Sequence, residues 1–106
     1  PAPGGTPDPV VATGTWDTEE AKGRISFTAS ANPNLDRYEL RYCAGSEYRT
    51  EDEVSIATLP ATASPLVFLT LDGLTTPGTT ALYRVYVILT TGNERGSNTV
   101  PVTRPA

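Results

Sequence analysis

The stretch from Leu74 to Val100, LTTPGTTALYRVYVILTTGNERGSNTV, constrains the fold more than any other part of the chain. Between Ala81 and Thr91 the residues are apolar, β-branched or aromatic with a single charge, which is the composition of a strand and lacks helical spacing. Pro77-Gly78 precedes this run, and Gly92-Asn93 with Gly96 follows it. The stretch therefore predicts a turn, a long strand, a hairpin and a return strand.

The remainder of the chain adds further short strands. Residues 10–16, 24–30, 36–43 and 66–71 have strand composition, and a shorter run surrounds Val54 and Ile56. In total we expect about seven antiparallel strands, the pattern of an all-β, immunoglobulin-like β-sandwich. Period-2 parity predicts a core that contains Ile25, Phe27, Tyr38, Leu40, Leu69, Leu71, Leu74, Val85, Val87 and Val100.

The chain length allows one domain. A sandwich of this type needs roughly 100 residues, and the chain has 106. Residues 1–9, PAPGGTPDP, hold four prolines and no apolar periodicity, so we interpret them as a linker and residues 10–104 as the domain. The sequence contains no methionine, and we expect it to be a segment of a longer protein.

Composition excludes several classes of function. The net charge of −4 and the pI of about 4.6 argue against a nucleic-acid partner, which would require clustered basic residues. We expect no membrane insertion, because no apolar run is long enough to span a bilayer. The chain has no histidine, and its single cysteine, Cys43, can form no internal disulfide and has no obvious base beside it. We therefore predict no enzyme activity, no catalytic residues, no cofactor and no metal site.

Six short motifs resemble the bacterial-type fibronectin type III family, a module found in larger secreted or surface proteins. The motifs are 38–42 (YELRY), 71–74 (LDGL), 77–79 (PGT), 83–85 (YRV), 92–94 (GNE) and 97–100 (SNTV). The resemblance implies a sandwich of this family's topology, an extracellular location and a role in connecting or binding. It also implies that neighbouring domains of the same polypeptide are partners and that the isolated domain is a monomer.

The chain departs from the family pattern at two aromatic positions. A tryptophan that the family carries late in its second strand is replaced here by Ala29, and we expect a buried Trp16 to fill that volume. The family's corner tyrosine, counted back from Gly92, falls on Ala81, whereas Tyr83 lies two residues later with the same parity. The corner has therefore either shifted to Tyr83 or been lost.

Three features that could suggest a site have simpler explanations. The acidic groups at 17–20 and 51–53 lack the ligand spacing of a calcium loop, so we interpret them as solvated turns. In Arg95-Gly96-Ser97, serine occupies the place of the aspartate of an adhesion motif, and we attribute Gly92 and Gly96 to hairpin geometry with positive φ. Cys43 is expected to be a small residue at a strand end.

The candidate interaction face comprises Arg41, Arg84, Tyr86 and Ile88. If Val85 and Val87 point inward, alternation places these four residues on the outer face of the sheet. Exposed aromatic and aliphatic residues beside arginines are typical of an interface centre. The alternative is that arginine stems cover the apolar row.

These observations favour a noncatalytic spacer or interaction module of a larger extracellular or cell-surface protein. The alternative is a recognition module for protein or carbohydrate, using the outer sheet face or the loops around Tyr48 and Trp16.

Overall fold

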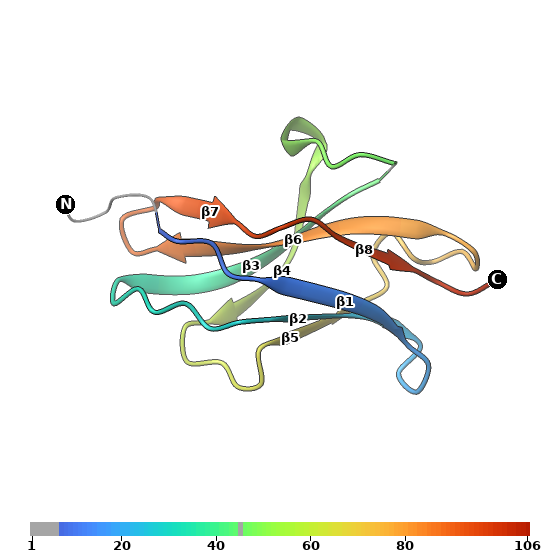
Figure 1. Ribbon diagram of the computed structural model, residues 1–106, viewed down its shortest axis with the longest axis horizontal. Helices are drawn as coiled ribbons and strands as arrows, with labels where there is room; N and C mark the ends of the chain where they lie inside the picture. The colour runs from blue at the N-terminus through green and yellow to red at the C-terminus, as the bar shows by residue number, and fades with distance from the viewer. Residues whose placement is uncertain (1–6, 45) are drawn as a thin grey trace.

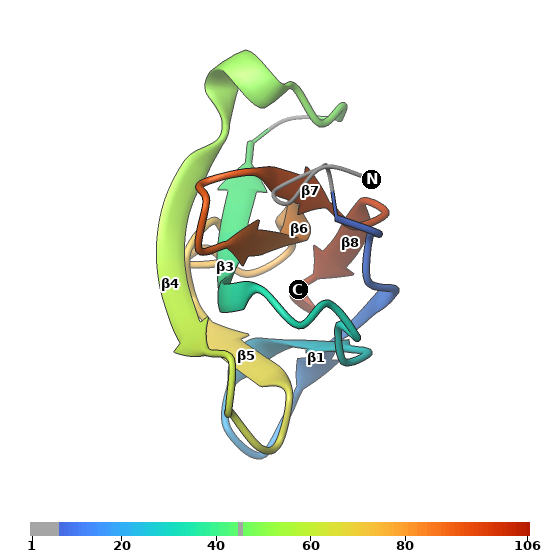
Figure 2. The same cartoon turned by 90° about the vertical axis from the view of Figure 1, so that its left-hand side faces the viewer.

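The computed structural model describes residues 7–44 and 46–106, and they form two packed antiparallel sheets. Figure 2, which looks along the long axis, shows β1 and β5 packed beneath β3, β6 and β7. The predicted immunoglobulin-like sandwich is confirmed. One sheet has the order β1-β2-β5, from strands Ala12–Asp17, Lys22–Phe27 and Val67–Thr70. The other has the order β4-β3-β6-β7, with β8 also paired to β6; its strands are β3 (Leu35–Cys43), β4 (Val54–Pro60), β6 (Thr80–Leu89), β7 (Glu94–Gly96) and β8 (Val100–Thr103).

The eighth strand arises because the return strand is divided in two. Tyr86 pairs with Gly96 in β7, whereas Tyr83 pairs with Val100 in β8, so the register shifts by one residue between them. Ser97 occupies the irregular position, where its Oγ accepts a hydrogen bond from the Val85 N–H at 3.0 Å. Local side-chain bonding therefore replaces a bond of the ladder.

Residues 1–6 of the predicted linker lie outside the described residues. Within the rest of that linker, Pro7 is buried, whereas Asp8 and Pro9 are exposed. The first strand begins at Ala12. None of the described residues forms a helix that could span a bilayer; the one helical segment among them is the 3-10 turn η1, Thr50–Asp52.

Most of the predicted core is buried between the sheets. Leu40, Val85 and Val87 are fully buried on the inner faces of β3 and β6. The other correctly predicted core residues are Ile25, Phe27, Tyr38, Leu74 and Val100. In β2 and β3, polar and apolar residues alternate, and this alternation predicts which side chains face the core.

The predicted parity of β5 is wrong. Leu69 and Leu71 are 40% and 37% exposed, while Phe68 and Thr70 are buried. Phe68 stacks on Phe27 with ring centroids 5.5 Å apart, so the aromatic ring occupies the core. Because residues 66–69 are all apolar, the local sequence does not distinguish the two faces.

Trp16 does not fill the volume that we assigned to it. Strand β2 ends at Phe27, and Ala29 is exposed beyond it. Trp16 pairs with Gly23 at the opposite end of β2, where it is partly buried against the core. The rings of Phe27 and Tyr38 pack against each other in the core, with centroids 4.8 Å apart.

The tyrosine corner is present and lies at Tyr83. Its hydroxyl donates to the backbone carbonyl of Asp72 at 2.5 Å, which ties the segment after β5 to β6. Burial raises the pKa of Tyr83. Gly73 has φ of +79°, and a Cβ there would lie 2.8 Å from that of Ala81, so the corner also requires glycine.

A pair of leucine substitutions tests the corrected register of β5. We expect Leu40→Ala to lower the free energy of unfolding by about 2–5 kcal/mol through lost burial and a cavity. Leu69→Ala, on the solvent face, should cost less than about 1 kcal/mol. Urea unfolding measures both. Equal losses would mean that Leu69 points inward.

Removal of one oxygen atom tests the corner. Tyr83→Phe leaves the Asp72 carbonyl without its donor and should cost about 1–3 kcal/mol. The Leu74 amide, which donates to Leu71 at 2.8 Å, should then exchange its hydrogen faster. Tyr42→Phe is a matched control, because its ring lies 6.2 Å from that of Tyr83. An unchanged exchange rate at Leu74 in Tyr83→Phe would show that the corner bond does not hold this turn.

Candidate functional site

The pairing of β3 with β6 brings the four predicted interaction residues onto one face. Arg41 lies opposite Arg84, and Glu39 lies opposite Tyr86. Ile88 lies opposite Glu94 on β7. The predicted outward parity of Arg41, Arg84, Tyr86 and Ile88 is therefore correct.

The apolar members of this face are covered. Tyr86 and Ile88 are only 6% and 3% exposed, so the expected exposed row does not exist. The Arg41 guanidinium lies over the Tyr86 ring, 3.9 Å from its centroid. Gly96 allows β7 to cross the same ring, because a Cβ there would lie 3.0 Å from Tyr86 Cζ. Gly96 is needed for this close approach. Of the two glycines for which we predicted positive φ, Gly92 has it and Gly96 does not.

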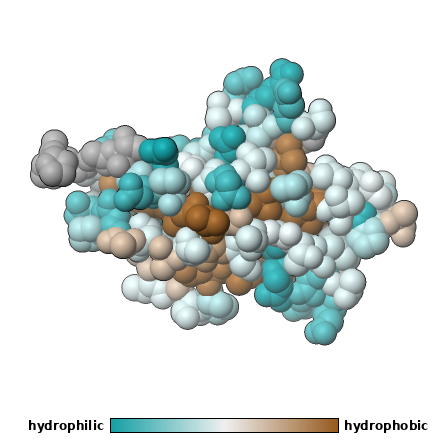
Figure 3. All heavy atoms as spheres, viewed as in Figure 1, coloured by the Kyte–Doolittle hydropathy of each residue, from teal (hydrophilic) through white to brown (hydrophobic). Residues whose placement is uncertain are grey.

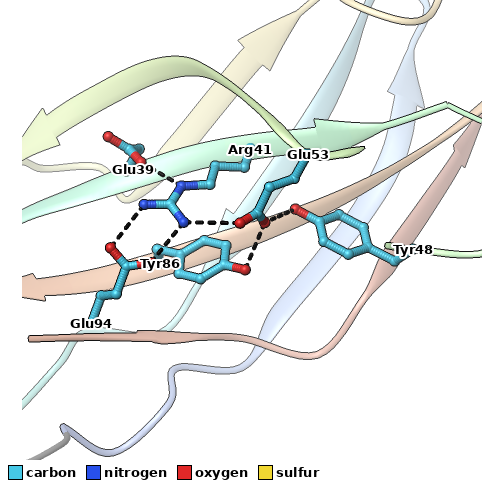
Figure 4. A network of polar contacts seen from close by, with 6 residues as sticks. All are labelled: Glu39, Arg41, Tyr48, Glu53, Tyr86 and Glu94. Carbon is cyan, nitrogen blue, oxygen red and sulfur yellow. Dashed lines mark hydrogen bonds and ion pairs between the residues drawn. The ribbon is translucent and has the colours of Figure 1, made fainter. Parts of the chain in front are cut away.

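Arg41 is the centre of an ionic network (Figure 4). Its Nη1 and Nη2 bind both oxygens of Glu94, at 2.7 and 3.0 Å. Nη1 also donates to Glu53 at 3.1 Å, and Nε donates to Glu39. Burial alone would lower the pKa of Arg41, but the hydrogen bonds to Glu94 and Glu39 raise it. The arginine is therefore held permanently charged among three carboxylates.

Glu53 joins the network to the loop before β4. The hydroxyls of Tyr48 and Tyr86 donate to its Oε1 at 2.6 and 2.7 Å. Burial would raise the pKa of Glu53, but the two tyrosines and Arg41 lower it overall. The same burial, together with the carboxylate, raises the pKa of Tyr48 and Tyr86. At neutral pH Glu53 is ionised and both tyrosines keep their protons.

Arg84, on β6, contacts the loop between β3 and β4. Its guanidinium lies 4.2 Å from the centroid of the Tyr48 ring, and its Nε donates to Thr99 Oγ1 at 3.0 Å. The loop from β3 to β4 projects from the body in Figure 1 and is largely hydrophilic in Figure 3. Tyr48 thus attaches the base of an exposed polar loop to the sheet.

The polar groups of this face already bind one another. Arg41 and Arg84 stand against Glu39, Glu53 and Glu94, so two positive and three negative charges leave one negative charge. Among the described residues, no buried side-chain nitrogen or oxygen lacks a hydrogen-bond partner. Arg41, Glu53 and the hydroxyls of Tyr48 and Tyr86 therefore form one network within the domain.

Sequence reasoning missed the roles of Glu53 and Glu94, and it named Tyr48 only as part of a candidate recognition loop. The sequence pattern places Glu53 in a solvated acidic turn with Glu51 and Asp52. Glu51 and Asp52 are exposed as expected, but Glu53 is half-buried. Glu53 meets Tyr86 across 33 positions of sequence, and Arg41 meets Glu94 across 53. No local pattern reports contacts over that separation.

The other candidate residues have structural roles. Asp17 accepts the amides of Glu19 and Glu20, each at 3.0 Å, and pairs with Arg24 at 2.7 Å. These bonds, that of Glu20 foremost, lower the pKa of Asp17. The Cys43 thiol is buried and donates to the carbonyls of Ala44 and Glu47. The described residues hold no group of three or more metal-ligating side chains.

One shallow groove lies beside the exposed side of β5. It has a volume of about 530 Å³ and runs between the end of β4 and the outer face of the smaller sheet. It is lined by Arg24, Leu59, Pro60, Ala63, Ser64, Pro65, Val67 and Leu69. Its walls are mainly aliphatic, with one cation.

Comparison with known proteins identifies solved structures with a similar fold. No model of a protein family matches the sequence, and no curated protein matches it. The structure is similar to an Fn3-like protein from Clostridium thermocellum, with a TM-score of 0.71 and 16% identity over 96% of this chain and 97% of that one.

Part of two larger enzymes is also similar. Pectate lyase Pel3 from Pectobacterium carotovorum matches with a TM-score of 0.70 and 17% identity over 89% of this chain and 27% of the lyase. Pectate lyase PelI from Erwinia chrysanthemi, in complex with tetragalacturonic acid, matches with a TM-score of 0.70 and 18% identity over 89% and 28%. The chain thus corresponds to little more than a quarter of either lyase. Its own fold is that of a small fibronectin type III-like module.

Proposed function

We propose that this domain is a noncatalytic spacer within a larger extracellular protein. The observation that carries the proposal is the position of its two ends. The body measures 48 × 29 × 17 Å, and the described chain begins at one end of the long axis and finishes at the other (Figure 1). Domains attached at both ends would be held apart by the full length of the sandwich.

The chemistry of the outer face supports the same role. An interface centre usually offers aromatic and arginine side chains for contact. Here Tyr86 is covered, and the Arg41 side chain is only 14% exposed while it pairs with three carboxylates. The absence of histidine from the chain also favours a noncatalytic role. Extracellular placement rests on the resemblance of the sequence motifs to modules of secreted and surface proteins.

A recognition module remains the second candidate, and the groove beside β5 favours it. Aliphatic walls with one cation would suit an acidic chain molecule, of which the tetragalacturonic acid bound to PelI is an example. However, Arg24 is already paired with Asp17 at 2.7 Å, so an acidic ligand would compete with that carboxylate. This pairing makes the spacer the better supported function.

A tandem of two copies, joined through their own ends, tests the spacer function. Small-angle X-ray scattering should give a maximum dimension of about twice the 48 Å long axis, because each copy continues the line of the other. A compact tandem with side-by-side copies would contradict the proposal.

Titration tests the second candidate. We expect amide resonances of Arg24 and Leu69 to stay unchanged when tetragalacturonic acid is added to the ¹⁵N-labelled domain. Saturable shifts at these two positions, abolished in Arg24→Ala and retained in Arg95→Ala, would replace the spacer by acidic-carbohydrate recognition.

A further inference from the structure

The segment after β8 remains attached to the domain. The Arg104 N–H donates to the Thr79 carbonyl at 2.8 Å, and the Gly78 N–H donates to the carbonyls of Arg104 and Pro105 at 3.0 and 3.2 Å. These bonds continue the pairing of Thr80 with Thr103 beyond the end of both strands. The tail of residues 104–106 therefore lies along the loop of residues 74–79.

The Arg104 side chain adds a second set of contacts. Its Nη1 donates to the carbonyls of Leu74 and Thr75, at 2.9 and 3.1 Å. The guanidinium lies over the ring of Trp16, 5.2 Å from the centroid. Charged donors make stronger hydrogen bonds than neutral ones, and an indole ring attracts a cation. One side chain thus joins the tail, the loop and the end of β1.

The loop that receives these bonds is itself fixed to the core. Tyr83 binds the Asp72 carbonyl at the start of the segment, and the Leu74 side chain is completely buried. Gly78 has φ of +84°, and a Cβ there would lie 4.0 Å from Ala106. The tail consequently rests on a loop that is anchored to the core at Asp72 and Leu74.

We propose that Arg104 is a clamp that holds the tail as a stiff continuation of β8. A polypeptide that extends past Ala106 would leave the domain in a direction set by the sandwich, without a hinge at this junction. The clamp is a property of the domain; its use in keeping neighbouring domains at a fixed angle rests on the proposed spacer function.

Nuclear spin relaxation of backbone amides tests the clamp in the full chain. In the wild type, we expect order parameters of about 0.85 at Gly78 and at position 104, the value of rigid backbone. Arg104→Ala should lower both below about 0.6, with those of β3 and β6 unchanged. Arg95→Ala is the matched control, since Arg95 is an exposed arginine on β7, and it should leave both positions at their wild-type values.

Two results would overturn the clamp: an order parameter below about 0.6 at position 104 in the wild type, or wild-type order at Gly78 and position 104 in Arg104→Ala. If Arg104→Ala does not fold, Arg104→Lys replaces it. Lysine keeps the charge near Trp16 but lacks the planar fork. Lowered order in Arg104→Lys supports the clamp, and wild-type order overturns it. Ligand binding at the outer face would refute the spacer function without changing these order parameters.

Discussion

The pairing of β3 with β6 is the interaction on which the rest of the structure depends. The two strands are in register from Tyr38 opposite Val87 to Cys43 opposite Leu82. Strand β6 also pairs with β7 and β8, so it is central in the larger sheet. Its inner row, with Val85 and Val87, belongs to the core, and Tyr86 of its outer row lies beneath the Arg41 guanidinium. A slip of one residue would exchange these two rows.

The outer row shows how a small domain can bury both faces of one strand. Tyr86 has no second sheet above it, yet it is 6% exposed. The Arg41 guanidinium lies across its ring, and Gly96 lets β7 approach it closely. The three carboxylates around Arg41 compensate the cost of removing its charge from water, which an unpaired arginine would pay in full. These contacts bury the aromatic ring of a face whose composition is typical of an interface centre.

Local alternation made much of the core predictable, and its absence explains the errors. Polar residues separate Tyr38, Leu40 and Tyr42, so the inner face of β3 was evident. In β5 the continuous apolar run gave no such signal, and Leu69 was placed on the wrong face. For the corner tyrosine, the sequence left two alternatives: a shift to Tyr83 or the loss of the corner. The hydrogen bond from Tyr83 to the Asp72 carbonyl shows that it has shifted.

For the candidate interaction face, the sequence predicted which way the side chains point but not how far they are exposed. Parity places Arg41, Arg84, Tyr86 and Ile88 outward from the sequence alone. The Arg41 guanidinium that covers Tyr86 is held by Glu53 and Glu94, which are distant in sequence. The same limit applies to Arg104, whose partners Leu74 and Trp16 belong to other segments. Sequence periodicity predicts which face of the sheet a side chain lies on, but it does not predict the residues that contact the side chain on that face.

The free energy of unfolding of Arg41→Ala tests most directly whether the outer face is structural. The substitution leaves Glu39, Glu53 and Glu94 beside one another without their shared cation and uncovers Tyr86. The account predicts a loss of about 3–5 kcal/mol in urea unfolding, as when a buried ion pair loses one partner. A change within about 0.5 kcal/mol, typical of a solvent-facing position, would contradict it. Arg41 would then be available for a ligand.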